Sequence, residues 1–565
     1  MQSSPQKSSG RVSVLVPVPT QRAIYDYKLN QEDDHAYQVG DYVAVPFGNR
    51  TLYGMIWSLA PTDPALPPEK LKIICSRPSV MNALPALPQD HLKFMAWMAN
   101  YTLAPLGMIA KLTIGMKDIF KDFKRAKPLS QVISPESADQ SKALTPAIKQ
   151  LSSAQQQAAA GIIASLSSAK FSVSLLDGVT GSGKTEVYFQ AIAENLARNR
   201  QSVILLPEIA LSSHFLTRIK THFGIVPTLW HSDLTPATRR KAWHHIATGK
   251  AKIVLGARSA LFLPFQSLGL VVVDEEHDAS YKQSDGVCYH ARDMAVMRAK
   301  YANAAVILAS ATPSLESLVN AQQEKYDHYQ LPDRYGGASL PKLVLIDLTK
   351  QQLKAQHFIS LPLQQAIKER LALQQQSLLF LNRRGYAPLL LCRHCGYRFA
   401  CPHCSAWLVA HRYGQGPAHE QHTPPYLACH HCGFKQLMPD ACPECDDTEA
   451  LAACGPGVER LEQEAAALFP HARIAIASAE TLHNSKQAEA FIEQVHANEI
   501  DIIIGTQIIA KGYHFPKLTL VGVIDADLGL QGGDLRAGER CYQLMHQVAG
   551  RAGRADLKGE VLLQT

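Results

Sequence analysis

Hydrophobic and polar positions alternate over short runs near the start of the chain. Within residues 11–60, runs such as RVSVLVPVP and DYVAVPFG are separated by Gly, Pro and Asn, a pattern typical of short strands joined by turns. Residues 88–112 then show the apolar spacing of a helical segment. Residues 113–150 are polar, locally basic and interrupted by Ser and Pro. We therefore expect a β-rich module over residues 1–112 and a linker over 113–150.

After Gln150 the pattern changes to short buried-strand runs that alternate with helical stretches. The first set of runs is FSVSLLDG, SVILLP, AKIVLG, LGLVVVDEE and AVILASAT, and the second is KLVLIDL, SLLFLNRRG, ARIAIAS, IDIIIGT and LTLVGVIDAD. This alternation is typical of parallel sheets covered by helices. The expected fold class is α/β, with one domain over 151–335 and a second over 336–391 and 455–565. A cysteine-rich insertion over 392–454 interrupts the second domain.

Net charge and hydropathy indicate which partners and which cellular compartment suit the chain. The formal net charge of +7 suits a polyanionic partner without requiring one. The N-terminus MQSSPQKSSG has no apolar segment of a secretory signal, and no run approaches 18 apolar residues. We expect a cytoplasmic protein that has no membrane partner and keeps its cysteines reduced.

A glycine-rich loop links the first strand run after Gln150 to a helix. Its sequence, GVTGSGKT, matches the phosphate-binding motif GxxxxGK[ST] in the strand–helix context that this motif requires. Backbone N–H groups would bind phosphate, Lys184 would reach the β- and γ-phosphates, and Thr185 would ligate Mg²⁺. The alternative is a glycine-rich turn without a ligand. The predicted ATP-binding residues of this loop are Gly178, Val179, Thr180, Gly181, Ser182, Gly183, Lys184 and Thr185.

Further residues complete a predicted ATPase site. Asp274 and Glu275 end the apolar run LVVVDEEHD, so Asp274 is expected to hold Mg²⁺ and Glu275 to orient or deprotonate the attacking water. Gln155 can read adenine through its amide, or it can be an ordinary polar residue of a helix. Arg551 and Arg554 lie three apart and, if helical, share a face that can point at one phosphate.

Eight of the twelve cysteines form four CxxC pairs between residues 392 and 445. In a reducing compartment, this spacing favours two structural Cys₄ zinc sites over disulfides. Three pairings of the four CxxC units are possible, and joining the second with the third leaves residues 405–428 between them, closest to ordinary zinc-ribbon spacing. Nearby histidines find no vacancy, because four thiolates complete each metal. So short an insertion buries little core, and metal can supply its folding energy.

The motifs stand in the order found in superfamily 2 helicases. They are GVTGSGKTE, LLPEIAL, GARSALF, DEEH, LASATPS, LFLNRRGY, GTQIIAKGYHF and QVAGRAGR. Together with VPVPTQRAIYDY and the cysteine insertion, they make the chain resemble the primosomal protein N′ (PriA) family of bacterial replication-restart helicases. The resemblance extends from the N-terminal module to the last residue. It implies two RecA-like motor domains in tandem, with ATP, Mg²⁺ and two Zn²⁺ as cofactors.

The resemblance also implies a function and partners. Members of this family unwind DNA in the 3′→5′ direction at stalled or abandoned forks, using ATP, and initiate primosome assembly. The implied partners are forked and single-stranded DNA, single-strand-binding protein, other primosome proteins and the machinery that loads the replicative helicase. Two other hypotheses are a fork-binding assembly scaffold with an inactive motor, and a duplex translocase that does not separate strands.

Site residues carried over from the resemblance fall into four groups. Ser310, Ala311 and Thr312 of LASATPS couple hydrolysis to DNA movement. In the loop after Glu276, Tyr281, Tyr289 and His290 stack on single-stranded bases, and Val287 stands where an aromatic residue is expected. One zinc takes Cys392, Cys395, Cys442 and Cys445, and the other takes Cys401, Cys404, Cys429 and Cys432. The pocket for the 3′ end of a nascent strand comprises Tyr25, Asp26, Tyr27, Gly48 and Lys72.

The sequence departs from the family pattern in two places. Residues 113–150 are too few for the winged-helix domain that usually precedes the motor, so we expect that domain to be absent or vestigial. The chain stops at GEVLLQT, where the family continues into a C-terminal domain, so we expect a fragment or the loss of that domain.

Overall fold

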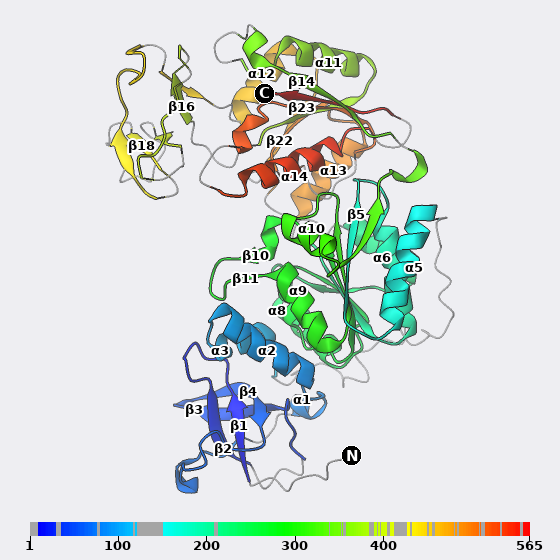
Figure 1. Cartoon of the computed structure of the whole chain (residues 1–565), viewed down its shortest axis with the longest axis vertical. Helices are drawn as coiled ribbons and strands as arrows, with labels where there is room; N and C mark the ends of the chain where they lie inside the picture. Colours follow the sequence, from blue (N-terminus) through cyan, green and yellow to red (C-terminus); the bar gives the residue numbers. More distant parts are fainter. Residues whose placement is uncertain are drawn as a thin grey trace. The chain divides into compact units, whose positions relative to one another are not determined.

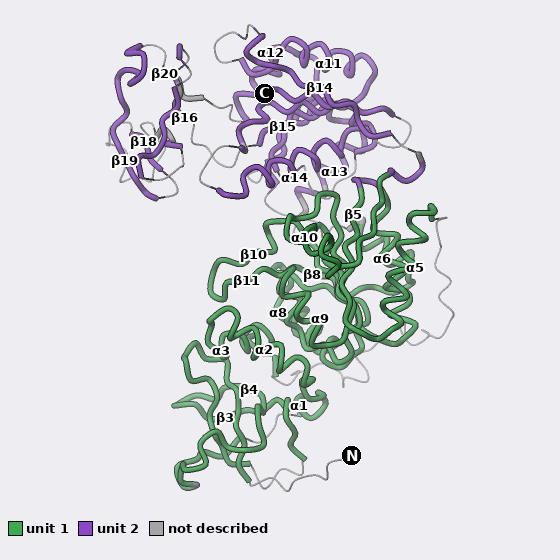
Figure 2. The backbone as a smooth tube through the Cα atoms, in the orientation of Figure 1, with its two compact units in different colours: residues 1–178, 182–332 green, residues 179–181, 333–565 purple. Residues whose placement is uncertain are grey.

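The computed structural model divides into two compact units. Unit 1 comprises residues 1–178 and 182–332, and unit 2 comprises residues 179–181 and 333–565 (Figure 2). No helix among the described residues is long and apolar enough to cross a membrane. The structure describes residues 10–29, 36–75, 79–116, 119–120, 151–207, 213–337, 339–351, 353, 357–382, 389–392, 394–395, 397–403, 407–411, 426–429, 432–448, 451–454, 458–478, 481–482, 485–507, 509, 515–530, 534–553 and 557–565.

Unit 1 begins with a four-stranded antiparallel sheet in the order β2-β1-β4-β3 (Figure 1). This sheet confirms the β-rich N-terminal module. Alternate residues of β1, such as Val12 and Val14, enter a hydrophobic core, because successive side chains of a strand point to opposite faces. The strands are β1 (Arg11–Leu15), β2 (Ile24–Lys28), β3 (Tyr42–Phe47) and β4 (Arg50–Ser58).

The helical segment expected over 88–112 is two helices. Leu103 adopts a positive φ of 54° and ends the first one, and Pro105 precedes the second. Proline disfavours helical backbone in the residue before it, so a single helix cannot continue through this point. The elements of this region are η1 (Pro68–Lys70), α1 (Ser79–Asn82), α2 (Gln89–Thr102) and α3 (Leu106–Ile114).

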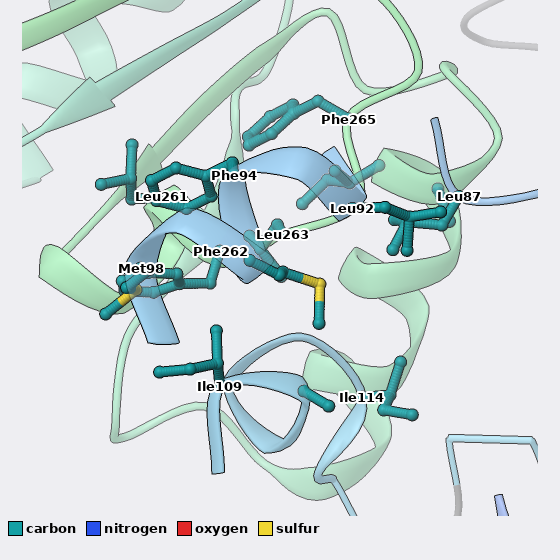
Figure 3. Close-up of a cluster of buried hydrophobic side chains, with 14 of the residues drawn as sticks. Leu87, Leu92, Phe94, Met98, Ile109, Ile114, Leu261, Phe262, Leu263 and Phe265 are labelled. Atoms are coloured by element: carbon teal, nitrogen blue, oxygen red, sulfur yellow. The ribbon is translucent and has the colours of Figure 1, made fainter. Parts of the chain in front are cut away.

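Helices α2 and α3 pack into the same core as the motor domain that follows them. Figure 3 shows Phe94 and Met98 of α2 and Ile109 of α3 beside Phe262, and the rings of Phe94 and Phe262 stack at 6.1 Å. Phe120 is fully buried and packs edge-to-face on Trp243. The expectation of a linker starting at residue 113 is therefore corrected, because α3 and Phe120 belong to the core. Residues 121–150 lie outside the described part of the chain.

The first motor domain is a parallel sheet in the order β13-β5-β12-β9-β6-β8-β7. Residues of α5, α6 and α7 form the core on one face, and residues of α8 and α9 form the core on the other. The strands are β5 (Ser172–Gly178), β6 (Gln201–Leu205), β7 (Thr228–Trp230), β8 (Ile253–Gly256), β9 (Leu268–Asp274), β12 (Ala305–Ser310) and β13 (Asp327–Leu331), with a small hairpin of β10 (Lys282–Gln283) and β11 (Tyr289–His290). The helices are α5 (Ser153–Ser167), α6 (Lys184–Ala197), α7 (Ser213–Phe223), α8 (Pro236–Ala247), η4 (Arg258–Phe262), η5 (Ala279–Tyr281), α9 (Ala291–Ala302) and α10 (Leu315–Gln322).

Unit 2 contains a second parallel sheet, in the order β14-β24-β23-β15-β22-β21. Helices α11 and α12 contribute to the core on one face, and α13 and α14 contribute to the core on the other. The strands are β14 (Lys342–Ile346), β15 (Gln376–Phe380), β21 (Ile474–Ala477), β22 (Ile502–Gly505), β23 (Leu518–Val523) and β24 (Glu560–Gln564). The helices are η6 (Tyr335–Gly337), η7 (Leu348–Lys350), α11 (Leu361–Ala372), α12 (Val458–Leu468), α13 (Ser485–His496), η8 (Asp527–Gly529) and α14 (Ala537–Ala549). The two parallel sheets confirm the predicted α/β class with two motor domains.

The cysteine-rich insertion forms a separate antiparallel sheet in the order β19-β18-β17-β16-β20 (Figure 1). Strands β16 and β20 pair with each other, so the chain enters and leaves the insertion side by side. A small core contains Leu390, Phe399, Leu408 and Leu427. The strands are β16 (Leu389–Cys392), β17 (Val409–His411), β18 (Tyr426–Ala428), β19 (Lys435–Leu437) and β20 (Leu451–Cys454).

Candidate functional site

The glycine-rich loop connects β5 to the first turn of α6. Gly181 and Gly183 have φ values of 88° and 82°, a left-handed backbone that side chains strain and glycine adopts readily. A Cβ atom on Gly183 would lie 2.2 Å from Nε2 of Gln155. Gly183 caps α6, so the N–H groups of the first helical turn open onto the loop. This arrangement suits a phosphate group.

Gln155 fixes this loop from the adjacent helix α5. Its Nε2 donates to the carbonyl of Ser182 at 2.7 Å, and its Oε1 accepts from the backbone N–H of Ser152 at 2.8 Å in a capping box. The side chain is only 1% exposed. The structure therefore gives Gln155 a role in holding the loop, and the predicted contact with adenine remains a prediction.

The predicted catalytic carboxylates end β9. Burial raises the pKa of Asp274 to about 6, with the charge of Glu275 adding to the shift and Lys184 opposing it. Lys184 itself donates to the carbonyl of Gly178 at 2.7 Å. Glu275 adopts a positive φ of 49°, a strain on the order of 1 kcal/mol for a residue with a side chain. Lys184 of α6 therefore lies near enough to Asp274, at the end of β9, to favour its ionised form.

Two buried polar atoms of this site have no hydrogen-bond partner among the described residues. They are Oγ of Ser182 in the loop and Oε2 of Glu275, which lies 3.7 Å from Nδ1 of His277. Buried polar atoms are normally paired, so these two mark a place for a missing ligand. A hydroxyl that can donate to phosphate and a carboxylate oxygen that can accept from water fit ATP and its attacking water.

The ends of β9 and β12 are joined behind the carboxylates. Nδ1 of His277 lies 2.7 Å from Oγ of Ser310, which also accepts from the backbone N–H of Thr312 at 2.9 Å. Glu276 is fully buried, accepts from Ser314 and pairs with Arg292 at 3.2 Å. These bonds connect the DEEH and SAT segments, as the resemblance implies, while their coupling role stays a prediction.

The aromatic loop after Glu276 differs from the expectation. Tyr281 is 1% exposed and its hydroxyl lies 2.6 Å from the carbonyl of Asp274, while Tyr289 is 5% exposed and packs on Phe262. Val287 is also buried in the same core. The expectation that Tyr281 and Tyr289 are free to stack on bases is therefore corrected: burial leaves neither ring an open face in this structure.

Arg551 of QVAGRAGR does not lie in a helix. Helix α14 ends at Ala549, and Arg551 lies in the turn after it, with its N–H donating to the carbonyl of Val548 at 3.0 Å. Arg554 lies outside the described residues. A residue that the motif analysis missed, Arg334, is 7% exposed and donates to the carbonyls of Gly550 and Gly553. Arg334 thus holds the turn that carries Arg551.

The cysteines of the insertion gather in the predicted sets. The ligand atoms of the first set lie within 4.8 Å of one another, and the described members of the second set do the same. Cys404 lies outside the described residues. Four thiols at this separation can surround a tetrahedral Zn²⁺, which four thiolates ligate in structural sites. The first set is Cys392, Cys395, Cys442 and Cys445, and the second is Cys401, Cys429 and Cys432.

Three residues of the predicted 3′-end pocket are partly or fully exposed. Gly48 occupies the turn between β3 and β4 with a φ of 60°, and no described atom lies within 4 Å of where its Cβ would be. Tyr25 is half-buried and packs edge-to-face on Phe47 at 5.3 Å. The side chain of Lys72 is exposed. Tyr25, Gly48 and Lys72 keep accessible groups for a nucleotide.

The other two residues of that pocket are more enclosed than expected. Tyr27 is 4% exposed, and burial raises its pKa to about 12. Asp26 is 8% exposed and accepts hydrogen bonds from Ser13 and from the N–H groups of Thr62 and Asp63. Burial opposes ionisation of Asp26, yet these bonds hold its pKa below the ordinary value. Tyr27 is therefore a core residue, and Asp26 anchors the loop at residues 60–63.

Another residue that motif analysis missed is Tyr188 on α6. Its hydroxyl donates to Oδ2 of Asp274 at 3.1 Å, and the side chain is fully buried. Tyr188 follows Lys184 by four residues, so both side chains lie on one helix face. That spacing was the available sequence signal.

Comparison with known proteins agrees with this architecture. Three family models match: the 3′ DNA-binding domain (3′BD) of PriA over residues 13–115, the DEAD/DEAH box helicase over 152–321, and the helicase conserved C-terminal domain over 450–556. These domains, with the phosphate loop and the carboxylates of β9, define a helicase that carries a DNA-binding module.

Curated relatives identify the family. The replication restart protein PriA of Rickettsia conorii is 44% identical over 555 residues, covering 98% of this chain and 80% of that protein. The one of Haemophilus influenzae is 36% identical over 618 residues, covering 98% of this chain and 82% of that protein. The chain belongs to the PriA family of replication restart proteins. A solved structure of RecG bound to a three-way DNA junction aligns with a TM-score of 0.43 at 16% identity, over 74% of this chain and 43% of that chain, and adds nothing further.

Proposed function

We propose that this chain is an ATP-dependent helicase that unwinds DNA in the 3′→5′ direction, recognises stalled or abandoned forks and initiates primosome assembly. The observation that carries the proposal is the half-buried group of Lys184 at the start of α6 and Asp274 and Glu275 at the end of β9. In unit 1, strand β9, which leads to these carboxylates, shares a hydrophobic core with the 3′ DNA-binding module. The same compact body thus has the means to bind a DNA end and to hydrolyse nucleotide.

The residues of the ATPase site have separate tasks. ATP with Mg²⁺ supplies the phosphoryl group whose transfer to water releases the free energy for movement. The N–H groups of residues 178–185 and Lys184 bind the phosphates, and Thr185 and Asp274 hold the metal. Glu275 orients the water and takes its proton. Arg551 and Arg554 are assigned to the charge that develops on the phosphoryl group, a contribution worth roughly 10³–10⁵ in rate in other systems.

The remaining assignments concern DNA, zinc and partners. Tyr25, Asp26, Gly48 and Lys72 are assigned to the 3′ end of a nascent strand. The eight CxxC cysteines hold two structural Zn²⁺ ions. Single-strand-binding protein, other primosome proteins and the machinery that loads the replicative helicase are the proposed protein partners in the cytoplasm.

Steady-state ATPase and unwinding assays on the full chain test the proposal. ATP turnover should rise with DNA, and forks with a 3′ single-stranded arm should be unwound while forks with only a 5′ arm are not. Lys184→Ala should lose both activities and keep fork binding, because the loop lysine contacts phosphate rather than DNA. Lys170→Ala, an exposed lysine outside the loop, is the matched control.

Each alternative has its own outcome in the same assays. Fork binding without any DNA-stimulated turnover would show an assembly scaffold. Turnover that displaces a triplex strand but separates no duplex would show a translocase. Turnover retained in Lys184→Ala would overturn the assigned ATPase site.

A further inference from the structure

The hydroxyl of Tyr188 interacts with both residues that are assigned to the metal. It lies 3.1 Å from Oδ2 of Asp274. The side chain of Thr185, one helical turn earlier, acts on the same phenol and opposes the rise of its pKa that burial causes. Thr185 and Tyr188 are three residues apart on α6, which places them on one face of the helix. One buried oxygen therefore connects the helix after the phosphate loop to the end of β9.

The ring of Tyr188 is held in place on all sides. It is fully buried in the core between α6 and the sheet, and it packs edge-to-face on Phe189 with ring centroids 5.5 Å apart. A phenol hydroxyl turns only about its C–O bond, so a fixed ring also fixes the position of its oxygen. The hydroxyl therefore acts as a rigid point from which two side chains are oriented.

We propose that Tyr188 is a positioning residue that orients Thr185 and Asp274 for divalent-cation binding. This inference rests on the proposed ATPase function. Tyr188 is not assigned a contact with the nucleotide or the metal. It acts through the two side chains that do.

The count of protons and lone pairs supports this role. A threonine that binds a cation through its oxygen keeps its proton, which needs an acceptor, and the oxygen of Tyr188 can accept it. Tyr188 then gives its own proton to Oδ2 of Asp274, while Oδ1 accepts from the N–H of Glu275 at 3.0 Å. Each carboxylate oxygen keeps a further lone pair for the cation. The hydrogen bonds from Thr185 to Tyr188 and from Tyr188 to Asp274, here called the relay, can therefore all persist when a metal is bound.

The magnitude follows from what such supporting bonds contribute elsewhere. Groups that hydrogen-bond to metal ligands typically change metal affinity about 10- to 100-fold when they are removed. Tyr188→Phe deletes one oxygen and keeps the buried ring. We expect the dissociation constant for the cation to rise about 10-fold, with little change in nucleotide affinity in the absence of metal.

The experiment uses the full chain and Mn²⁺ as the probe. Free Mn²⁺ is followed by electron paramagnetic resonance while protein and ADP are titrated, and a fluorescent ADP analogue measures nucleotide binding in EDTA. ATP turnover is then measured against Mg²⁺ concentration. For Tyr188→Phe we expect weaker Mn²⁺ binding and a higher half-saturating Mg²⁺ concentration, with kcat largely restored at saturating Mg²⁺.

The matched control is Tyr42→Phe. Tyr42 is also a fully buried tyrosine of unit 1, and its hydroxyl has no hydrogen-bond partner in the described part of the chain. Tyr42→Phe also removes one buried phenol oxygen, but at a position in β3 that is distant in sequence from Thr185, Tyr188 and Asp274. It should therefore bind Mn²⁺ as the unmodified chain does. Nucleotide binding in EDTA shows that each variant is folded, and Tyr188→Met serves as a second apolar replacement if the Phe variant does not fold.

The outcomes separate this inference from the proposed function. Mn²⁺ binding by Tyr188→Phe that equals that of the unmodified chain would overturn the positioning role. An equal loss in Tyr42→Phe would overturn it as well, because the effect would then come from core packing. Failure of the unmodified chain to bind Mn²⁺ with ADP would overturn the ATPase assignment and this inference together.

Discussion

Replacing Asp90 by alanine should destabilise unit 1 by leaving a buried charge without its partner. Asp90 lies at the start of α2, and its Oδ2 accepts from Nη1 of Arg298 on α9 at 2.6 Å. Arg298 is fully buried and sits 5.9 Å from the centroid of the Phe94 ring. Arginine does not lose its proton in proteins, so the charge remains after the substitution.

The size of the effect follows from burial. Breaking a buried ion pair by removing one partner costs about 3–5 kcal/mol. The Asp90 side chain is 30% exposed, so water replaces part of the lost interaction. We expect a loss of about 2 kcal/mol, a roughly 30-fold change in the unfolding equilibrium constant.

Denaturant unfolding followed by tryptophan fluorescence measures this loss. Four of the five tryptophans lie in unit 1, at positions 57, 97, 230 and 243, so the signal reports mainly on that unit. The control is Glu194→Ala, which removes the partner of Arg198 in an exposed pair and should cost under about 1 kcal/mol. Equal effects of the two substitutions would refute the reasoning. Adding Arg298→Met to Asp90→Ala should recover much of the stability, because the unpaired charge is then gone.

Three further predictions concern the other sites. Elemental analysis should find two zinc ions per chain. Cys401→Ser should lower the zinc content and disrupt the folding of the insertion more than it lowers ATP turnover. Intact unwinding by a chain without zinc would contradict a structural role of the metal. A DNA end with a 3′-hydroxyl should bind the full chain better than one with a 3′-phosphate, and Asp26→Ala should weaken this preference. The control Ser13→Ala leaves the carboxylate of Asp26 in place and should preserve the preference. An equal effect of the two substitutions would indicate that the loop at residues 60–63 is disrupted. The pKa of Asp274 is raised to about 6 from an ordinary 3.8, so its ionisation destabilises the nucleotide-free fold. Asp274→Asn should therefore stabilise that fold at pH 8 by about 3 kcal/mol, a gain that fades as the pH falls through 6 to below 4, and pH-independent unfolding midpoints would refute this.

The sequence predicts those parts of the fold that depend on residues close together in the chain. Apolar runs bounded by Gly and polar residues identify the buried parallel strands, and the phosphate loop follows from glycine positions that need a positive φ. The Asp274–Glu275 pair was predictable, because a carboxylate at the end of a parallel strand faces the ligand edge. The cysteine sets were predictable from the spacing of thiols and the family resemblance.

The errors arose where distant contacts decide the outcome. The aromatic character of Tyr281 and Tyr289 suggested base stacking, but periodicity does not reveal that η4 and the end of β9 cover both rings. The shared face of Arg551 and Arg554 depended on a helix, but α14 ends at Ala549, and the turn that carries Arg551 is held by Arg334, over 200 residues earlier. Sequence spacing alone does not show such long-range partners.

Buried hydrogen bonds join the N-terminal helices α2 and α3 to helices α8 and α9 of the motor domain. His91 of α2 is fully buried, and burial, followed by the charge of Arg298, holds its pKa well below the ordinary value. The neutral ring has one acceptor and one donor nitrogen: Nδ1 lies 3.3 Å from Nη2 of Arg298, and Nε2 lies 3.3 Å from Oγ1 of Thr113 on α3. The carbonyl of Thr113 accepts in turn from Nε1 of Trp243 on α8 at 2.9 Å. These buried bonds tie α2 and α3, which lie within the region matched by the 3′ DNA-binding domain, to α8 and α9 of the first motor domain. Because the contacts that make them are over 100 residues apart in the chain, local hydrophobic pattern could not predict that the N-terminal helices share a core with the motor sheet.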